Sequence, residues 1–482
     1  MGSLSDPLRV RSSVPLALNF VASAMGSSIL FSYPEIATIA GVQGSITYAA
    51  CSALPLMIFP VLAPIIRRKL PEGFILTMWV RERFGVVASL YLSFLTVATM
   101  FLYMVAELSA LGQVIETLTG LKGLPVIIVE VVVTTIYTAL GGFKVSFITD
   151  NIQGAMIGLL IIICAIAVGT SVTIDTALIA PSGLLEQSKL GYQLIFILLI
   201  GIVFSDMFLS NFWMRAFASK TDKDLWIGCG LASLAVFIIL LLVSSTGFIA
   251  AWAGVWTPDV YGGLAFFLLL GKLPAWVVGF VVVMVVALSV PVRPRSNHSM
   301  LLLTPAVFDS LQSAMVSTIS NDVFRSKLPF IYIRVLVALI TIPVIIIAVK
   351  KPSILQIFLI SNIVATATLP SILLGLSERF YFLNGFDVIC GGLGGMLSVF
   401  IFGSIYYGDA HQGAELMILK KGLYGDDWSA FGVFLVAPLG SLIFLTLAYG
   451  LRLSATWVFC KATGRPFRAL DRPVGPPPDA KI

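Results

Sequence analysis

Long apolar segments recur along the whole chain, and few charged residues separate them. Hydrophobic residues make up 58% of the 482 residues, whereas Asp, Glu, Lys and Arg together make up only 11%. Soluble domains usually carry about a quarter charged residues. This chain is therefore too poor in charge to cover a water-exposed surface, and most of its outer face must contact lipid.

Apolar runs of about 20 residues are long enough to cross a bilayer as helices. Twelve such runs occur, the eighth of them interrupted, near residues 14–33, 44–66, 86–117, 124–142, 149–174, 190–214, 225–253, 274–323, 328–349, 353–376, 385–407 and 429–460. The sequence thus predicts an all-α integral membrane protein of about 12 transmembrane helices. We expect one transmembrane domain over 14–462, a short N-terminal segment, 1–13, and a disordered tail, 463–482.

Basic residues gather in alternate loops between the predicted spans. Arg67, Arg68 and Lys69 follow the second span, and Lys220 and Lys223 follow the sixth. Cytoplasmic loops of membrane proteins accumulate Lys and Arg. The pattern therefore predicts that both termini are cytoplasmic, and the net charge of +6 reflects topology rather than nucleic-acid binding.

Catalytic and metal-binding patterns are missing from the sequence. The five cysteines lie singly without metal spacing, and the two histidines, His298 and His411, have no partner of the His-Glu-x-x-His type. A membrane-embedded enzyme would need a nucleophile–base pair or a metal cluster. We therefore expect no enzyme activity and no cofactor.

Two predicted spans contain small polar residues where a regular helix would be expected. The first carries Ala22–Ser28 around Gly26, and the sixth carries Gly201 and Phe204–Asp206, followed by Ser210 and Asn211. In a fold of two five-helix repeats these spans occupy corresponding positions, and paired irregularities there indicate a transport site. The alternative is that small residues simply allow close helix packing.

Acidic residues within apolar spans are a second indication of function. Asp206, Glu107, Glu130 and Asp309 lie within or near such spans, where a charge costs about 2.5–3.5 kcal/mol on insertion scales. Glu130 is consistent with a helix end. Glu107 fits an interhelical hydrogen bond and a functional role equally well.

Four segments match motifs of one transporter family. They are 18–27 around the first irregularity, the pair 137–144 and 149–153 with the pattern YT-x-GG … TD-x-x-Q, the stretch 212–220, and 307–324. In these segments the chain resembles the sodium/solute symporters, nearest to the fungal-type urea transporter branch. The resemblance implies a five-plus-five inverted-repeat (LeuT-type) fold, alternating access, a plasma-membrane location and sodium coupling.

The resemblance also implies a sodium site. The ion would lie between the backbone carbonyls of Ala22 and Met25 and hydroxyl groups near Ser289 or Ser310. Asp150 resembles a family carboxylate associated with cation binding, although it is also placed to cap the fifth span. Coupling to H+ instead of Na+ stays an alternative.

The predicted function is uptake of a small polar solute, with urea first. Candidate substrate-binding residues are Ser27, Ser28, Asp206, Gln312 and Trp213, the last of which is also typical of an interfacial anchor. The alternatives are proton-coupled transport of polyamines or amino acids on the same fold, and a sensor that has lost transport. The expected partners are the solute and the lipid bilayer, with no nucleic acid and no obligatory protein partner.

The eighth span is interrupted by residues 290–306, which include Pro291, Arg293, Pro294 and Arg295. Removing them would join Ser289 to Val307 and restore a helix like that of the family. We interpret the segment as an aberrant insertion, the translation of a retained intron, that would distort the ion site if present.

Sequencing the transcript tests this interpretation. We expect the mature message to lack the codons for 290–306, because an uninterrupted span does not accommodate Pro291, Arg293, Pro294 and Arg295 at this place. A message that encodes Arg293 and Arg295 would contradict it.

Overall fold

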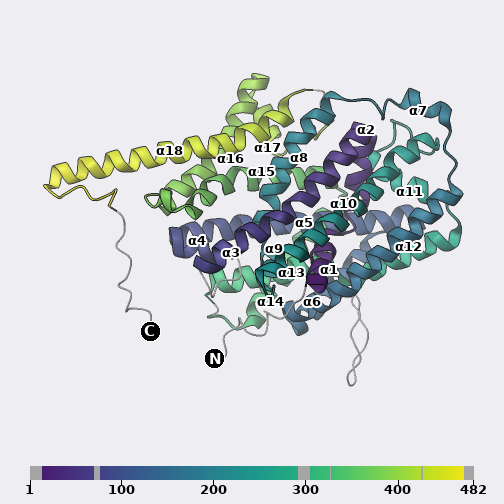
Figure 1. Cartoon of the computed structure of the whole chain (residues 1–482), viewed down its shortest axis with the longest axis horizontal. Helices are drawn as coiled ribbons and strands as arrows, with labels where there is room; N and C mark the ends of the chain where they lie inside the picture. The colour runs from purple at the N-terminus through teal and green to yellow at the C-terminus, as the bar shows by residue number, and fades with distance from the viewer. Residues whose placement is uncertain (1–12, 70–75, 291–303, 326, 425–426, 472–482) are drawn as a thin grey trace.

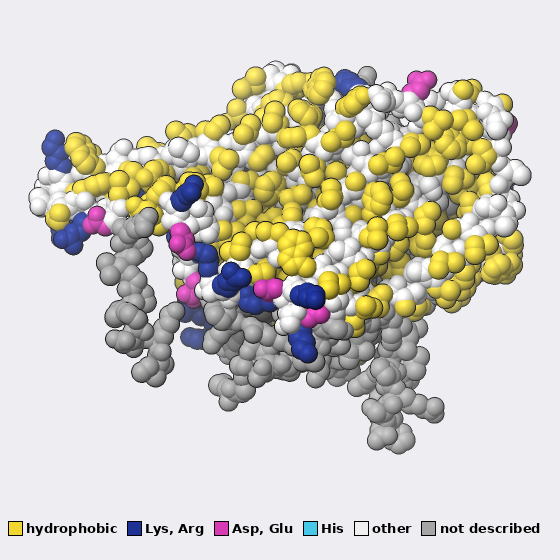
Figure 2. Space-filling view, viewed as in Figure 1, with side chains coloured by type: hydrophobic (Ala, Val, Ile, Leu, Met, Phe, Trp, Pro, Cys, Tyr) yellow, Lys and Arg dark blue, Asp and Glu magenta, His cyan; other side chains and the backbone are white. Residues whose placement is uncertain are grey.

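The computed structural model describes residues 13–69, 76–290, 304–325, 327–424 and 427–471. Within these ranges the chain is almost entirely helical, and nine helices are long and apolar enough to cross a membrane. The helices pack side by side in one bundle (Figure 1). Apolar side chains cover most of the face seen in Figure 2, with charged side chains gathered mainly along its lower edge. The prediction of an all-α, multi-pass membrane protein is confirmed.

The first half of the chain forms ten α-helices and one 3-10 turn. Their bounds are α1 Ser13–Ala24, α2 Ile29–Ala53, η1 Leu54–Ile58, α3 Phe59–Lys69, α4 Leu76–Phe84, α5 Val86–Thr119, α6 Leu124–Ser171, α7 Thr176–Ser182, α8 Lys189–Phe208, α9 Ser210–Phe217 and α10 Asp222–Trp252.

The remaining elements are shorter on average and include the two strands. They are η2 Gly262–Leu264, α11 Ala265–Leu270, α12 Ala275–Leu288, β1 Ser289–Val290, β2 Thr304–Pro305, α13 Ala306–Thr318, η3 Ile319–Val323, α14 Phe330–Ala348, α15 Ile354–Leu373, η4 Leu374–Leu376, η5 Glu378–Phe380, α16 Gly385–Tyr407, α17 Ala410–Met417 and α18 Ser429–Thr463. The N-terminal segment 1–12 and the tail beyond Asp471 lie outside the described residues.

The first predicted span is broken where the sequence indicated. Helix α1 ends at Ala24 and α2 begins at Ile29, so that Met25–Ser28 are unwound. A second interruption at Gly41 separates the first predicted span from the second. Gly41 has a φ of 59°, and a Cβ there would lie 2.0 Å from the carbonyl oxygen of Leu184. The positive φ and the lack of room for a Cβ therefore both require glycine at position 41.

The sixth predicted span is also broken, but later than expected. Helix α8 continues through Gly201 and Asp206, and the break comes at Leu209, which has an extended backbone between α8 and α9. Gly201 instead allows close packing, since a Cβ there would lie 2.9 Å from the Phe434 ring and 3.2 Å from Asn362. Close packing thus accounts for the glycine at position 201, and the extended backbone of Leu209 forms the transition from α8 to α9.

The fourth and fifth predicted spans, 124–142 and 149–174, are not separate helices in this structure. Both lie in α6, a single helix of 48 residues. A loop was expected near 143–148, yet Gly141 and Gly142 do not end the helix. Each glycine costs only about 1 kcal/mol relative to alanine, and no proline follows Pro125 within α6.

The interrupted eighth span folds as two helices joined through a pair of strands. The backbone of β1 pairs antiparallel with β2, with Ser289 opposite Pro305 and Val290 opposite Thr304. The chain thus leaves the end of α12 and returns to the start of α13 at the same place. Residues 291–303, the centre of the proposed insertion, lie outside the described residues.

Deleting 290–306 should therefore leave the bundle intact. The paired strands already bring Ser289 next to Pro305. A direct link from Ser289 to Val307 would therefore leave α12 and α13 close to their present positions. We expect the shortened protein to elute as a single species in detergent and to unfold at the same or a higher temperature than the full chain. A lower melting temperature, or loss of the folded species, would contradict this.

Candidate functional site

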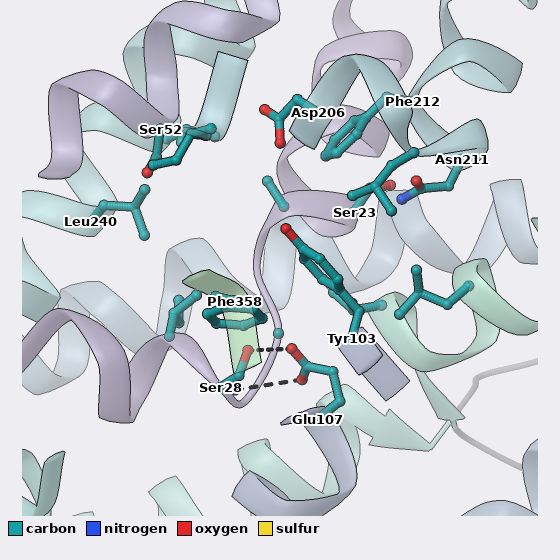
Figure 3. Close-up of a pocket in the computed structure, with 18 of the residues that line it drawn as sticks. Ser23, Ser28, Ser52, Tyr103, Glu107, Asp206, Asn211, Phe212, Leu240 and Phe358 are labelled. Atoms are coloured by element: carbon teal, nitrogen blue, oxygen red, sulfur yellow. Dashed lines mark hydrogen bonds between the residues drawn. The ribbon is translucent and has the colours of Figure 1, made fainter. Parts of the chain in front are cut away.

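A buried cavity lies at the centre of the bundle, where the two broken spans meet. Its volume is about 100 Å³, several times the 10–15 Å³ or so that one water needs. Figure 3 draws 18 of its lining residues and labels ten of them. The lining residues are Ser23, Ala24, Gly26, Ser28, Ile29, Tyr33, Tyr48, Ser52, Tyr103, Glu107, Ile202, Asp206, Leu209, Asn211, Phe212, Val236, Leu240, Val307, Leu311, Phe358 and Asn362.

Glu107, from the middle of α5, binds the unwound segment of the first span. The Ser28 hydroxyl donates to its Oε1 (Figure 3). The Ser28 backbone N–H donates to Oε2 at 3.4 Å, and the Ser27 hydroxyl donates to the same oxygen at 3.1 Å. The carboxylate therefore replaces helical hydrogen-bond partners that the break removes. It also lies at the N-terminus of α2, where the helix dipole favours a negative charge.

Gly26 makes this contact possible. A Cβ on Gly26 would lie 2.2 Å from Oε1 of Glu107, far inside van der Waals contact. Only glycine lets the carboxylate approach the unwound backbone this closely.

Asp206 is the second acidic residue of the cavity, and its surroundings differ from those of Glu107. It lies in the last turn of α8, where the helix dipole is negative and disfavours an anion. Its carboxylate accepts no hydrogen bond from the described side chains or backbone groups. A cation in the cavity would relieve both deficits, because it would pair with the carboxylate and with the negative end of α8.

Aromatic side chains form much of the wall between these two carboxylates. The Tyr33 and Tyr48 rings stack with centroids 4.0 Å apart, and the Tyr33 hydroxyl donates to Ser52 Oγ at 2.7 Å. Tyr103 shares a hydrogen bond of 2.9 Å with Ser205, next to Asp206. Aromatic faces attract cations as well as apolar chains.

The lining is acidic without any basic counterpart. Among the described residues that line the cavity, Glu107 and Asp206 are ionisable acids and none is Lys, Arg or His. The described part of the chain also holds no group of three His, Cys, Asp or Glu side chains placed to bind a metal ion. A cation in the cavity would therefore meet two acidic side chains and no basic one among its described lining residues.

The predicted substrate-binding residues divide into three groups. Ser28 and Asp206 line the cavity, and Ser27 lies beside it through its bond to Glu107. Trp213 and Gln312 lie elsewhere. Trp213 is fully buried among aromatic rings and donates from Nε1 to the Met207 carbonyl at 2.6 Å. Gln312 donates to Thr135 Oγ1 at 3.0 Å.

The predicted cation site is only partly described. Ala22 and Met25 are buried at the end of α1, where the last helical carbonyls have no intrahelical partner. The Ser310 hydroxyl accepts a hydrogen bond of 2.8 Å from the buried guanidinium of Arg215. The side chains of Asp150 and Ser289 lie outside the described residues.

Several lining residues gave no signal in the sequence. Tyr33, Tyr48 and Phe358 look like ordinary apolar positions of a span, and Asn362 is one of several polar residues in α15. Glu107 was recognisable as a buried acid. Its link to Ser27 and Ser28, 80 and 79 positions away, was not.

Replacing Gly26 by alanine tests the contact between Glu107 and the unwound segment. Gly26→Ala should displace the carboxylate and lower the unfolding free energy by about 1–3 kcal/mol, the cost of a buried polar group without its partner. The matched control is Gly230→Ala in α10, where an added Cβ meets no atom within 4 Å. Thermal unfolding in detergent measures both, and equal melting temperatures for the two variants would contradict the assignment.

Comparison with known proteins places the chain among membrane transporters, although no protein-family model matches it. It is 52% identical to a spermidine transporter of Candida albicans over 465 residues, which is 96% of this chain and 86% of that protein. A probable urea active transporter of Schizosaccharomyces pombe is 26% identical over 228 residues, or 43% of this chain and 34% of that protein.

Solved structures show the same fold at low sequence identity. A Na+-coupled sialic acid symporter superposes with a TM-score of 0.64 at 14% identity, over 92% of both chains. The nucleobase–cation symporter Mhp1 gives 0.57 at 13% identity, over 97% of both chains. These likenesses confirm the predicted five-plus-five inverted-repeat fold, and the relatives are transporters rather than enzymes. The chain belongs to the family of membrane transporters that includes the Candida spermidine transporter and, more distantly, the fungal urea transporters.

Proposed function

We propose that this protein takes up a polyamine of the spermidine class across the plasma membrane by alternating access. The observation that carries the proposal is a central cavity with two acidic side chains, Glu107 and Asp206, and no basic side chain among its described lining residues. The 52% identity to a spermidine transporter supports the same solute class.

The charges distinguish a polyamine from urea, the solute that the sequence predicted first. Urea is neutral and would leave Asp206 without a counter-charge. A polyamine brings ammonium groups joined by short methylene chains. An ammonium group would pair with Asp206, and the methylene chain would contact apolar walls such as Leu240 and Phe358. Hydrogen bonds between charged partners are about twice as strong as neutral ones.

Glu107 and Asp206 have different roles in this proposal. Glu107 is already stabilised by Ser27, Ser28 and the N-terminus of α2, so it holds the broken span in place and adds negative potential. Asp206 is without such donors in the described part of the chain and is the residue that binds an ammonium group. The unwound residues around Gly26 and Leu209 are the hinges about which the two broken spans tilt.

The driving force for a cationic solute includes the membrane potential. Each elementary charge gains about 2.3 kcal/mol per 100 mV, so a solute with three charges gains roughly 7 kcal/mol. Uptake of a polyamine therefore depends less on a coupling ion than uptake of urea would. A distorted ion site in the interrupted eighth span is compatible with transport, which weakens the alternative of a sensor that has lost transport.

A coupling ion, Na+ or H+, is part of the proposal. Na+ would use the positions that the family resemblance implies, Ala22, Met25, Ser289, Ser310 and Asp150. Because Arg215 already binds the Ser310 hydroxyl, and because Asp206 and Glu107 offer carboxylates that exchange protons, we place H+ ahead of Na+. Replacing external Na+ with K+, and separately collapsing the pH gradient, distinguishes the two ions.

The proposed orientation has both termini in the cytoplasm. Lys and Arg side chains gather mainly along the lower edge of the molecule in Figure 2, as cytoplasmic faces do. The basic loop residues Arg67 and Lys69 at the end of α3 would then face the cytoplasm.

Uptake of labelled spermidine by cells expressing the protein tests the proposal. Asp206→Asn keeps the size of the side chain but removes its charge. We expect at least about tenfold slower uptake below saturation, since a charge-assisted hydrogen bond contributes about 1.5–3 kcal/mol and 1.4 kcal/mol is a factor of ten. The control is Glu82→Gln, which changes an exposed acid of α4.

Labelled urea is the comparison solute. The proposal would be overturned if the wild type took up urea but not spermidine and if Asp206→Asn left the uptake of urea unchanged. Urea would then be the solute. Loss of spermidine uptake in the Glu82→Gln control as well would show that the assay reports surface charge or folding instead of the cavity.

A further inference from the structure

Another buried carboxylate, that of Glu35, lies on α2 and is not among the lining residues of the cavity. Glu35 has no exposed surface. The Tyr261 hydroxyl donates to its Oε2 at 2.8 Å, and the Tyr424 hydroxyl donates to its Oε1. In the described part of the chain no Lys, Arg or His pairs with this carboxylate. Its charge is thus balanced only by two neutral phenols.

The two tyrosines come from segments of the chain that are far apart in sequence. Tyr261 precedes η2, in the connection from α10 to α11, and Tyr424 lies between α17 and α18. The first segment packs directly on α2, since a Cβ on Gly262 would lie 3.4 Å from Glu35 Cα and 2.1 Å from Thr38 Oγ1. Glu35 therefore fastens two segments, far apart in sequence, to the helix that lines the cavity.

Glu35 is also close to the cavity. It follows Ser28 by seven residues, two helical turns or about 10 Å along the same face of α2. Tyr33, two residues before Glu35 on α2, lines the cavity and stacks on Tyr48.

Burying a carboxylate without a counter-charge is expensive, and phenol donors compensate only in part. An ammonium group forms a stronger, charge-assisted bond with the same oxygens. We propose that Glu35 is an outer binding site for an ammonium group of the solute, which displaces the Tyr261 and Tyr424 hydroxyls and so releases these two tyrosines from α2. The inference rests on the proposed function, because it requires a cationic solute.

The sign of the effects on uptake distinguishes a binding site from a structural link. At an amine site, Glu35→Gln removes the charge that attracts the solute and should raise the KM for spermidine about tenfold, or 1.4 kcal/mol. Tyr261→Phe and Tyr424→Phe remove competitors for the carboxylate and should lower the KM or leave it unchanged. A merely structural link would be weakened by all three, so a raised KM in both tyrosine variants would overturn the inference.

Binding to the purified full-length protein tests the same site independently of transport. Labelled spermidine is titrated onto the wild type, Asp206→Asn, and Asp206→Asn combined with Glu35→Gln, each checked for a single folded species by size exclusion. Glu186→Gln, an exposed acid between α7 and α8, replaces Glu35→Gln in the control. We expect Asp206→Asn to retain weak binding that is lost with Glu35→Gln and kept with Glu186→Gln.

The outcomes separate this inference from the proposed function. Absence of spermidine binding by the wild type would overturn the proposed function itself. Binding that disappears entirely in Asp206→Asn, or residual binding that survives Glu35→Gln, would leave the cavity as the solute site and overturn the outer site. If the double variant does not fold, Asp206→Asn with Tyr424→Phe replaces it, and residual binding weaker than in Asp206→Asn alone would contradict the inference.

Discussion

The carboxylate of Glu107 holds open the break on which the rest of the site depends. Residues Met25–Ser28 cannot be unwound inside a membrane unless other groups replace their helical hydrogen bonds. Glu107 supplies those acceptors to Ser27 and Ser28, and Gly26 leaves the space that it needs. With this contact, the first span stays divided into α1 and α2, and Gly26 and Ser28 of the unwound segment line the cavity.

Sequence patterns located the broken spans but not every side chain that faces the cavity. Gly26 and the serines beside it marked the first break correctly, and Asp206 lies in the cavity as expected. Trp213 and Gln312 were assigned to the site, whereas their neighbours Phe212 and Leu311 line it. One position along a helix turns a side chain by about 100°, so an error of one residue moves it from cavity to core. The sequence alone does not show which elements pack against a helix, so it does not fix the rotation of that helix about its axis.

Other differences have equally local causes. The break in the sixth span lies at Leu209 rather than at Gly201, because Gly201 serves the contact with Phe434 and Asn362. A glycine that permits close packing and one that permits unwinding look the same in sequence. The wall formed by Tyr33, Tyr48 and Tyr103 was not predicted, since aromatic residues in a span are usually lipid-facing or core positions. Only the tertiary fold brings these three rings from α2 and α5 to one wall.

The position of Glu35 on the first part of α2 has a mechanical consequence. The segment from Ile29 to Gly41 carries Ser28 at its hinged end and Glu35 about 10 Å along its axis. A tilt of about 10° at the hinge would move Glu35 by about 2 Å, which is enough to break a hydrogen bond of ordinary length. In the proposed function the helix would act as a lever, in which a small rotation beside the cavity becomes a displacement large enough to break the hydrogen bonds of Tyr261 and Tyr424 to Glu35. Conversely, a displacement of Tyr261 or Tyr424 would rotate the same part of α2 and shift the unwound backbone of Met25–Ser28.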